Sequence, residues 1–337
     1  MIKELISKLI DRHNLTSEEM ELAMNEIMSG NTTPAQIAAF LVALRMKGET
    51  IDEITSAAHV MRDKAIKIDI GNKTMVDTCG TGGDSMDTFN ISTISALVAA
   101  GAGITVAKHG NRAVSSRCGS ADLMEALGVK IDTHPSIVEK CLKEIGFGFL
   151  FAPIFHPAMK YAIGPRREVG IRTIFNILGP LSNPANATAQ VLGVFRKDLT
   201  EPLAYVLKNL GVKRAFVVYG QDGMDEITTT DSTKVSELKD RKVVTYDITP
   251  EEFNLKRANL SDLEGKDVET NVKITLEILQ GKKCPGREIA CLNAAAALVV
   301  GDIAKDFREG IKIAEESIDS GNALRKLELL KEYTQVK

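Results

Sequence analysis

The first seventy residues have the hydrophobic spacing of α-helices. Apolar residues recur at intervals of three and four positions over residues 2–10 and again over 37–44, as they do on one face of a helix. Thr16 and Thr50 are each followed three residues later by Glu, the pattern of a capping box at a helix start. Thr33 precedes a proline, which favours an N-cap and a first-turn proline. The pattern predicts a bundle of helices.

The pattern changes after Gly71, where short β-rich segments alternate with helical ones. The segments with strand character are 74–77, 104–107, 147–151, 189–195, 215–219 and 242–246. The segments with helical character are 91–100, 121–127, 201–210 and most of the chain from 270 onward. Alternation of strand and helix is typical of an α/β domain with a mostly parallel central sheet.

These patterns predict two domains of different class. We expect a small all-helical domain over residues 1–70, joined by helices from about 165–185, and a larger α/β domain over residues 71–337. Pro180 and the Asn-rich segment 183–186 interrupt the middle of the chain, and residues of this kind are common in loops. We therefore expect a hinge between the two domains.

Composition narrows the class of protein. The chain has 337 residues, and 42 Lys and Arg against 45 Asp and Glu give a net charge of −3. This balance argues against a general nucleic-acid binder, which is usually strongly basic. The five cysteines are widely spaced without a CxxC pair, which indicates reduced thiols. Residues 1–11 lack the apolar core of a signal peptide, and no apolar segment reaches the roughly 20 residues of a membrane span. We expect a cytoplasmic protein that binds neither nucleic acid nor membranes.

A glycine-rich segment is the sharpest local feature. Residues 77–84, DTCGTGGD, follow a predicted strand and lead through Thr88 to a helix that starts with NIST at 90–93. Glycines let the backbone approach an anion, and the N-terminus of the next helix adds partial positive charge. The segment matches neither the P-loop nor GxGxxG. A tight turn that merely needs glycine is the alternative, but the hydroxyl and amide side chains nearby favour phosphate or metal binding.

A cationic segment follows the next predicted strand. Residues 108–117, KHGNRAVSSR, contain three fixed cations and no acid. They precede a helix that we expect Ser120 to cap. Anions are the natural ligands of such a segment, although a basic surface loop is the alternative.

Acidic residues follow a third strand. Asp222, Asp225 and Glu226 come directly after 215–219. Carboxylates are ligands that Mg²⁺ prefers, and ligands of open α/β sheets bind at the carboxyl ends of the strands. A solvated acidic turn is the usual alternative, but two phosphate-seeking segments at the same edge favour a metal site.

Two arginines on a predicted helix could bind a carboxylate. Arg166 and Arg167 precede Glu168, and a guanidinium can hold a carboxylate through two hydrogen bonds. Pairing with Glu168 on the helix surface is the alternative, and we prefer it for Arg167.

Taken together, the motifs resemble one family. DTCGTGGD, NIST, KHGNRAVSSRCGSAD, HPAMK, RREVGIRTIFNILGPLSNP and DGMDE occur in the order seen in anthranilate phosphoribosyltransferases, and the resemblance covers effectively the whole chain. It implies a helical domain hinged to an α/β domain of the nucleoside phosphorylase-like class, and a homodimer that forms through the helical domain. The implied reaction moves a 5-phosphoribosyl group from phosphoribosyl diphosphate (PRPP) to the amine of anthranilate and releases diphosphate, a step of tryptophan biosynthesis.

The resemblance also implies site residues. The implied PRPP-binding residues are Gly80, Gly83, Asp84, Thr88, Asn90, Ile91, Ser92, Thr93, Lys108, His109, Gly110, Asn111, Arg112, Ala113, Val114, Ser115, Ser116 and Ser120. The implied anthranilate-binding residues are Gly80, Asn111 and Arg166. Two Mg²⁺ ions per monomer are implied, on Ser92, Asp225 and Glu226. No catalytic side chain is implied, because positioning and metal suffice. Pro165 stands where the family often has Val, and a proline stiffens the approach to Arg166.

Two other functions remain as alternatives. A pyrimidine nucleoside phosphorylase has the same fold and a similar Lys-His segment, but usually lacks both the Asn111-Arg112 continuation and the Asp-Glu pair. A non-catalytic nucleic-acid-binding relative would have lost the metal carboxylates and gained positive charge. The chain keeps Asp225 and Glu226 and is net acidic, which disfavours this alternative.

Overall fold

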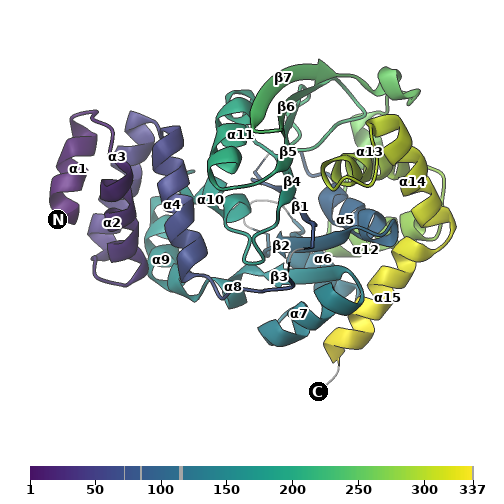
Figure 1. The fold of residues 1–337 in the computed structure, drawn as a ribbon, viewed down its shortest axis with the longest axis horizontal. Helices are drawn as coiled ribbons and strands as arrows, with labels where there is room; N and C mark the ends of the chain where they lie inside the picture. Colours follow the sequence, from purple (N-terminus) through teal and green to yellow (C-terminus); the bar gives the residue numbers. More distant parts are fainter. Residues whose placement is uncertain (72, 84–85, 114–116, 336–337) are drawn as a thin grey trace.

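The predicted fold class is confirmed. The structure, a computed structural model, describes residues 1–71, 73–83, 86–113 and 117–335. Within these residues a helical N-terminal region lies beside an α/β region that is built on a seven-stranded, mostly parallel sheet (Figure 1). Four of the predicted PRPP-binding residues lie outside the described residues: Asp84, Val114, Ser115 and Ser116. In the described part of the chain, no helix is long and apolar enough to cross a membrane.

The N-terminal region consists of helices, as predicted. Their bounds are α1 (Ile2–Ile10), α2 (Ser17–Met28), α3 (Pro34–Lys47) and α4 (Ile51–Lys64). Thr16, Thr33 and Thr50 each accept the backbone N–H of the residue three positions on, and the side chain of that residue accepts in return. An N-cap of this kind contributes about 1 kcal/mol to helix stability. The capping residues therefore decide where three of the helices begin.

The sheet carries the second region. Its strands are β1 (Met75–Gly80), β2 (Thr105–Gly110), β3 (Phe147–Phe151), β4 (Ala189–Gly193), β5 (Arg214–Gly220), β6 (Thr233–Lys239) and β7 (Lys242–Ile248). Their order is β3-β2-β1-β4-β5-β6-β7. The first five are parallel, and β6 and β7 pair antiparallel at one edge.

Strand β6 was not predicted from the sequence. Its residues TKVSELK include charged side chains between the apolar ones, so it lacks the continuous apolar run of the buried parallel strands. The turn between β6 and β7 has a recognisable backbone geometry. Asp240 and Arg241 both have positive φ, 50° and 59°. Two consecutive left-handed residues are typical of a type I′ hairpin turn, whose twist matches that of the strands.

The remaining helices cover both faces of the sheet, except that α9 packs against α2 and α3 of the helical region. Their bounds are α5 (Ile91–Gly101), α6 (Ser120–Ala126), α7 (Pro135–Glu144), α8 (Ala152–Phe155), α9 (Lys160–Val169), α10 (Phe175–Leu181), α11 (Thr200–Asn209), α12 (Val268–Leu279), α13 (Pro285–Val300), α14 (Phe307–Asp319) and α15 (Asn322–Gln335). α5 and α13 pack against each other and against the central strands, whereas α11 packs on β5 and β6 from the side of the helical region (Figure 1).

The helical region is packed onto the sheet rather than held apart from it. One apolar cluster runs from Leu9 in α1 through α9, α10 and α11 to Val217 in β5. Arg62 of α4 donates hydrogen bonds to the carbonyl oxygens of Leu181 and Leu210, at the ends of α10 and α11. Our assignment of Pro180 to a loop is wrong, because α10 continues through it to Leu181. The loop begins only after Leu181.

Candidate active site

The three motifs lie at one edge of the sheet. The glycine-rich segment begins in β1 and extends past its end, the cationic segment does the same at β2, and the acidic turn follows β5. In the strand order, β2, β1, β4 and β5 are neighbours and all run parallel. Their carboxyl ends therefore form a single edge, where open α/β sheets bind ligands.

The acidic turn contacts the glycine-rich segment directly. The N–H of Gly82 donates to Oδ2 of Asp225 at 2.8 Å. Gly80 and Gly193 are register partners at the ends of β1 and β4. A Cβ on Gly80 would overlap the carboxylate of Asp225, and one on Gly193 would overlap its carbonyl oxygen. Glycine is thus needed at both strand ends because the backbone and side chain of Asp225 occupy that space.

Glu226 reaches the first turn of α5. Its Oε1 accepts the N–H of Ser92 at 3.1 Å. The hydroxyl of Ser92 lies 3.3 Å from the ammonium of Lys108. Carboxylate and hydroxyl oxygens are the ligands that Mg²⁺ prefers, and these contacts bring the three predicted metal residues of the chain to one place. The donor set therefore fits a magnesium ion.

Lys108 of β2 and Asp77 of β1 are buried next to the candidate magnesium site. Lys108 Nζ donates to the carbonyl oxygen of Thr78 at 2.6 Å, and Asp77 Oδ1 accepts the N–H of His109 at 3.2 Å. Burial raises the pKa of Asp77 to about 6, because the charged form loses solvation. Burial also lowers the pKa of Lys108, while the charge of Asp77 opposes this shift. These two hydrogen bonds link β1 to β2 near their carboxyl ends.

Two buried histidines are neutral. The rings of His109 and His156 lie 5.0 Å apart, and His109 Nδ1 lies 3.2 Å from the carbonyl oxygen of Gly179, to which it donates in the Nδ1-protonated tautomer. Burial lowers the pKa of His109 to about 3 and that of His156 to about 4. Neither ring therefore carries charge at neutral pH. The side chain of His109 contacts α10, although the sequence places it among anion-binding residues.

The cationic segment is partly neutralised by the helix that follows. Arg112 forms ion pairs with Asp122 at 3.0 Å and with Glu125 at 2.7 Å, both in α6. The segment itself contains no acid, but acids outside it compensate this charge. Our expectation that Ser120 caps α6 is wrong. The N-cap is Gly119, whose N–H binds Asp122 at 3.0 Å.

The predicted anthranilate-binding residues are not joined by direct contacts. Arg166 stacks over the ring of Phe175 at 5.1 Å, and burial lowers its pKa. Among the described residues, Arg166 makes no hydrogen bond to Gly80 or Asn111. Pro165 lies inside α9, which continues to Val169, so the proline does not end the helix before Arg166.

Side chains that the sequence analysis did not single out hold the site in place. Asn271 of α12 accepts the N–H of Asn90 at 2.9 Å, and Asn293 of α13 binds both the N–H and the carbonyl of Ile227, at 3.0 and 2.8 Å. A lone amide in the otherwise apolar stretch 289–300 of α13 is a signal that could have identified Asn293. Asn271 had no such signal, because its partner lies 181 residues away.

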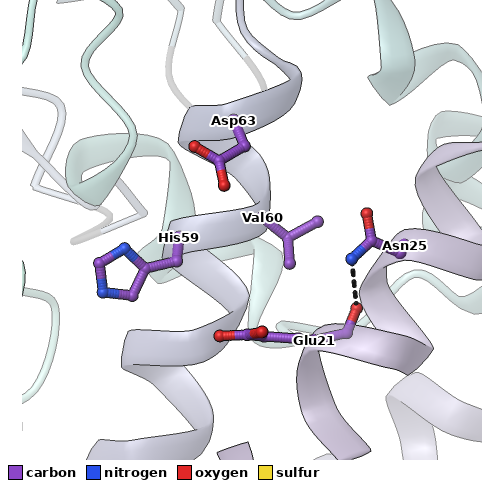
Figure 2. A pocket seen from close by; sticks show the side chains of 5 residues that line it. All are labelled: Glu21, Asn25, His59, Val60 and Asp63. Atoms are coloured by element: carbon purple, nitrogen blue, oxygen red, sulfur yellow. Dashed lines mark hydrogen bonds between the residues drawn. The ribbon is translucent and has the colours of Figure 1, made fainter. Parts of the chain in front are cut away.

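A cavity of about 310 Å³ lies away from this edge, between α2 and α4 (Figure 2). Its lining residues are Glu21, Asn25, His59, Val60 and Asp63, and none of them is a predicted site residue. The part of the chain that the structure describes contains no group of three His, Cys, Asp or Glu side chains arranged for a metal. We place the candidate active site at the sheet edge, where the three motifs lie.

Known proteins resemble the chain over its whole length. Residues 72–324 match the glycosyl transferase family a/b domain, and residues 3–65 match the helical bundle domain of the same family. The anthranilate phosphoribosyltransferase of Acetivibrio thermocellus is 56% identical over 99% of this chain and 97% of its own.

Solved structures agree with the sequence relatives. The anthranilate phosphoribosyltransferase of Thermus thermophilus superposes with a TM-score of 0.94 at 42% identity, covering 98% of this chain and 99% of its own. The Saccharomyces cerevisiae enzyme in complex with PRPP and Mg gives a TM-score of 0.91 at 31% identity, covering 99% and 97%. The chain belongs to the anthranilate phosphoribosyltransferase family.

Proposed function

We infer that the protein transfers the 5-phosphoribosyl group of PRPP to the amine of anthranilate, giving N-(5-phosphoribosyl)anthranilate and diphosphate in tryptophan biosynthesis. The main structural support for this function is the hydrogen bond from the N–H of Gly82, just beyond the end of β1, to the carboxylate of Asp225. It joins the acidic turn to the glycine-rich segment, so that oxygen ligands and backbone N–H groups share one edge. The names of the relatives supply the same reaction.

We propose that this edge binds the donor. Gly80 and Gly83 offer backbone N–H groups to the diphosphate, and the N-terminus of α5 favours its negative charge. Ser92, Asp225 and Glu226 would hold Mg²⁺, which supplies positive charge to the leaving diphosphate when it is bound. Lys108 places its Nζ 3.3 Å from the hydroxyl of Ser92. We also propose that two Mg²⁺ ions bind. Calorimetric titration with Mg²⁺ and PRPP measures their number.

The residues present favour catalysis by positioning. Breaking the C1–O bond of the donor develops positive charge on the ribose, as in glycoside hydrolysis. The amine of anthranilate is neutral near pH 7, so transfer needs no strong base. His109 and His156 fit this requirement, because burial lowers the pKa of both rings and makes them weak bases. Holding both substrates in reacting orientation supplies much of the rate enhancement.

The test of the function is the loss of anthranilate fluorescence in the presence of PRPP and Mg²⁺. We expect consumption to stop when either is omitted or when Mg²⁺ is chelated. A parallel assay offers inorganic phosphate with uridine or thymidine, the substrates of the alternative phosphorylase. Release of free base there, without anthranilate consumption, would assign the chain to that alternative.

We propose that Arg166 binds the carboxylate of anthranilate. Its guanidinium is held over Phe175 and is largely shielded from water, which strengthens an ionic hydrogen bond. We expect Arg166→Ala to raise the KM for anthranilate about thirtyfold, since a lost hydrogen bond to a charged group costs roughly 2 kcal/mol. Initial rates at saturating PRPP measure this. A change in the PRPP constant alone would contradict the assignment.

We propose that residues 1–70 with α9 and α10 form the small domain, and that this domain carries a homodimer contact. α1, α3 and α9 pack together and expose Ile10, Met46 and Ile163 at 65%, 64% and 46%. Large apolar side chains exposed on packed helices are a feature of interfaces. We expect the wild type to sediment as a dimer, and Ile10→Glu combined with Met46→Glu to sediment as a monomer. Val244→Glu, at a 57% exposed position on β7, is the control that should remain dimeric.

A further inference from the structure

Arg172 contacts the glycine-rich segment from outside the sheet. It lies between α9 and α10, its guanidinium donates to the carbonyl oxygen of Gly83, and its Cζ stacks over the ring of Phe195 at 4.4 Å. A Cβ on Gly83 would lie 2.9 Å from Nη2 of Arg172. The arginine therefore packs closely against this part of the segment and holds its carbonyl.

Other contacts fix the same segment to the end of β4. The N–H of Thr81 donates to the carbonyl oxygen of Gly193 at 2.9 Å, and the hydroxyl of Thr81 accepts the N–H of Phe195 at 3.0 Å. Phe195 thus supports the segment twice, through Thr81 and through the stacked guanidinium. Gly82 and Gly83 have φ of 66° and 77°, a conformation in which glycine is freer than any other residue. Such a segment needs external contacts to hold one shape.

The backbone around Arg172 is itself fixed. Gly170 ends α9 in the left-handed conformation and donates to the carbonyl oxygen of Arg166 at 3.1 Å. The N–H of Thr173 donates to the side chain of Asn176 at 2.9 Å. Arg172 therefore extends from a short, anchored connection. This makes its guanidinium a defined support for Gly83.

We propose that Arg172 is a positioning residue for donor binding. By holding the Gly83 carbonyl and stacking on Phe195, it keeps the glycine-rich segment in the shape that presents N–H groups to the diphosphate of PRPP. The role depends on the planar fork of arginine, because one face must stack while an edge donates. The proposal rests on the proposed function, since it names PRPP as the ligand of this edge.

The test measures the affinity for PRPP in the presence of Mg²⁺ in two ways. Steady-state kinetics give the KM, and calorimetry without anthranilate gives the Kd. We expect Arg172→Gln to raise both the KM and the Kd for PRPP about tenfold, the effect of one lost hydrogen bond to a charged group. The anthranilate KM at saturating PRPP and the Tm should stay unchanged. Arg172→Lys should resemble Arg172→Gln. Arg167→Gln, which removes the same charge from an exposed position of α9, should behave as wild type.

The variant Phe195→Leu distinguishes two roles of Arg172, namely support of the glycine-rich segment and direct contact with the diphosphate of PRPP. We expect it to raise the Kd for PRPP less than Arg172→Gln, and the double variant to be no weaker than Arg172→Gln alone. A wild-type Kd in Arg172→Lys would overturn the proposal, because charge alone would then suffice. So would a wild-type Kd in Phe195→Leu beside a weakened Arg172→Gln, which would indicate direct contact with the diphosphate. Wild-type binding of PRPP without anthranilate consumption would refute the proposed function but leave the role of Arg172 measurable.

Discussion

Asp225→Ala is expected to lower kcat/KM for PRPP by about three orders of magnitude, the range found when a principal electrostatic group of an active site is removed. The substitution removes a proposed metal ligand and also the acceptor of the Gly82 N–H. The glycine-rich segment would lose its contact with the acidic turn at the same time. Initial rates over a range of Mg²⁺ and PRPP concentrations measure the loss.

Asp225→Asn separates the two roles. An amide oxygen can still accept the N–H of Gly82, but it carries no charge for a metal. We expect Asp225→Asn to lose nearly as much activity as Asp225→Ala, and to require more Mg²⁺ for half-maximal rate. Asp247→Ala removes the same charge from an exposed position of β7 and should be fully active. An Asp225→Asn enzyme with wild-type Mg²⁺ dependence would show that the carboxylate only shapes the segment.

Gly193→Ala is expected to abolish most activity although Gly193 is not a predicted ligand of either substrate. The added Cβ would overlap the carbonyl oxygen of Asp225, which is backbone and has no rotamer to escape to. The acidic turn must therefore move away from Gly80, the register partner of Gly193. We expect a loss of activity of at least about a hundredfold and a fall of about 1–3 kcal/mol in the free energy of unfolding, as in overpacked cores.

Urea unfolding and initial rates together measure this effect. Gly164→Ala is the matched control, because Gly164 sits within helix α9 and no neighbouring atom lies within 4 Å of the point where the added methyl group would stand. Ala is the better helix former, so this variant should be as stable as wild type or slightly more. A fully active Gly193→Ala enzyme would mean that the turn of Asp225 tolerates displacement.

The sequence predicted the architecture because its signals are local. Capping residues placed α2, α3 and α4, and apolar runs placed the parallel strands within a few residues. The position of the three motifs after β1, β2 and β5 was enough to expect that they meet, because parallel strands share one edge. Strand β6 escaped notice because its place in the antiparallel part of the sheet, next to the edge strand, tolerates charged residues.

The supporting contacts could not be predicted because they join distant residues. Asn271 accepts a hydrogen bond from Asn90, which lies 181 positions earlier in the chain. Arg112 pairs with Asp122 and Glu125, which lie 10 and 13 positions later. No local sequence pattern predicts which distant residue such a side chain contacts. The same holds for Arg172, which lies within the motif RREVGIRTIFNILGPLSNP. Its contact with Gly83 depends on how the connection between α9 and α10 folds back. Burial likewise decides the charge state of His109, which the sequence cannot show.

The strand order has a consequence for biosynthesis of the polypeptide. β4 lies between β1 and β5, so a growing chain that has emerged only through β3 leaves one side of β1 without a hydrogen-bonded neighbour. Unpaired strand sides attract other chains, and pairings between segments distant in sequence form slowly. During the interval before residues 189–193 emerge from the ribosome, this side of β1 is therefore open to pairing with other chains. Fragments truncated within that interval should depend on chaperones more than the full-length chain does.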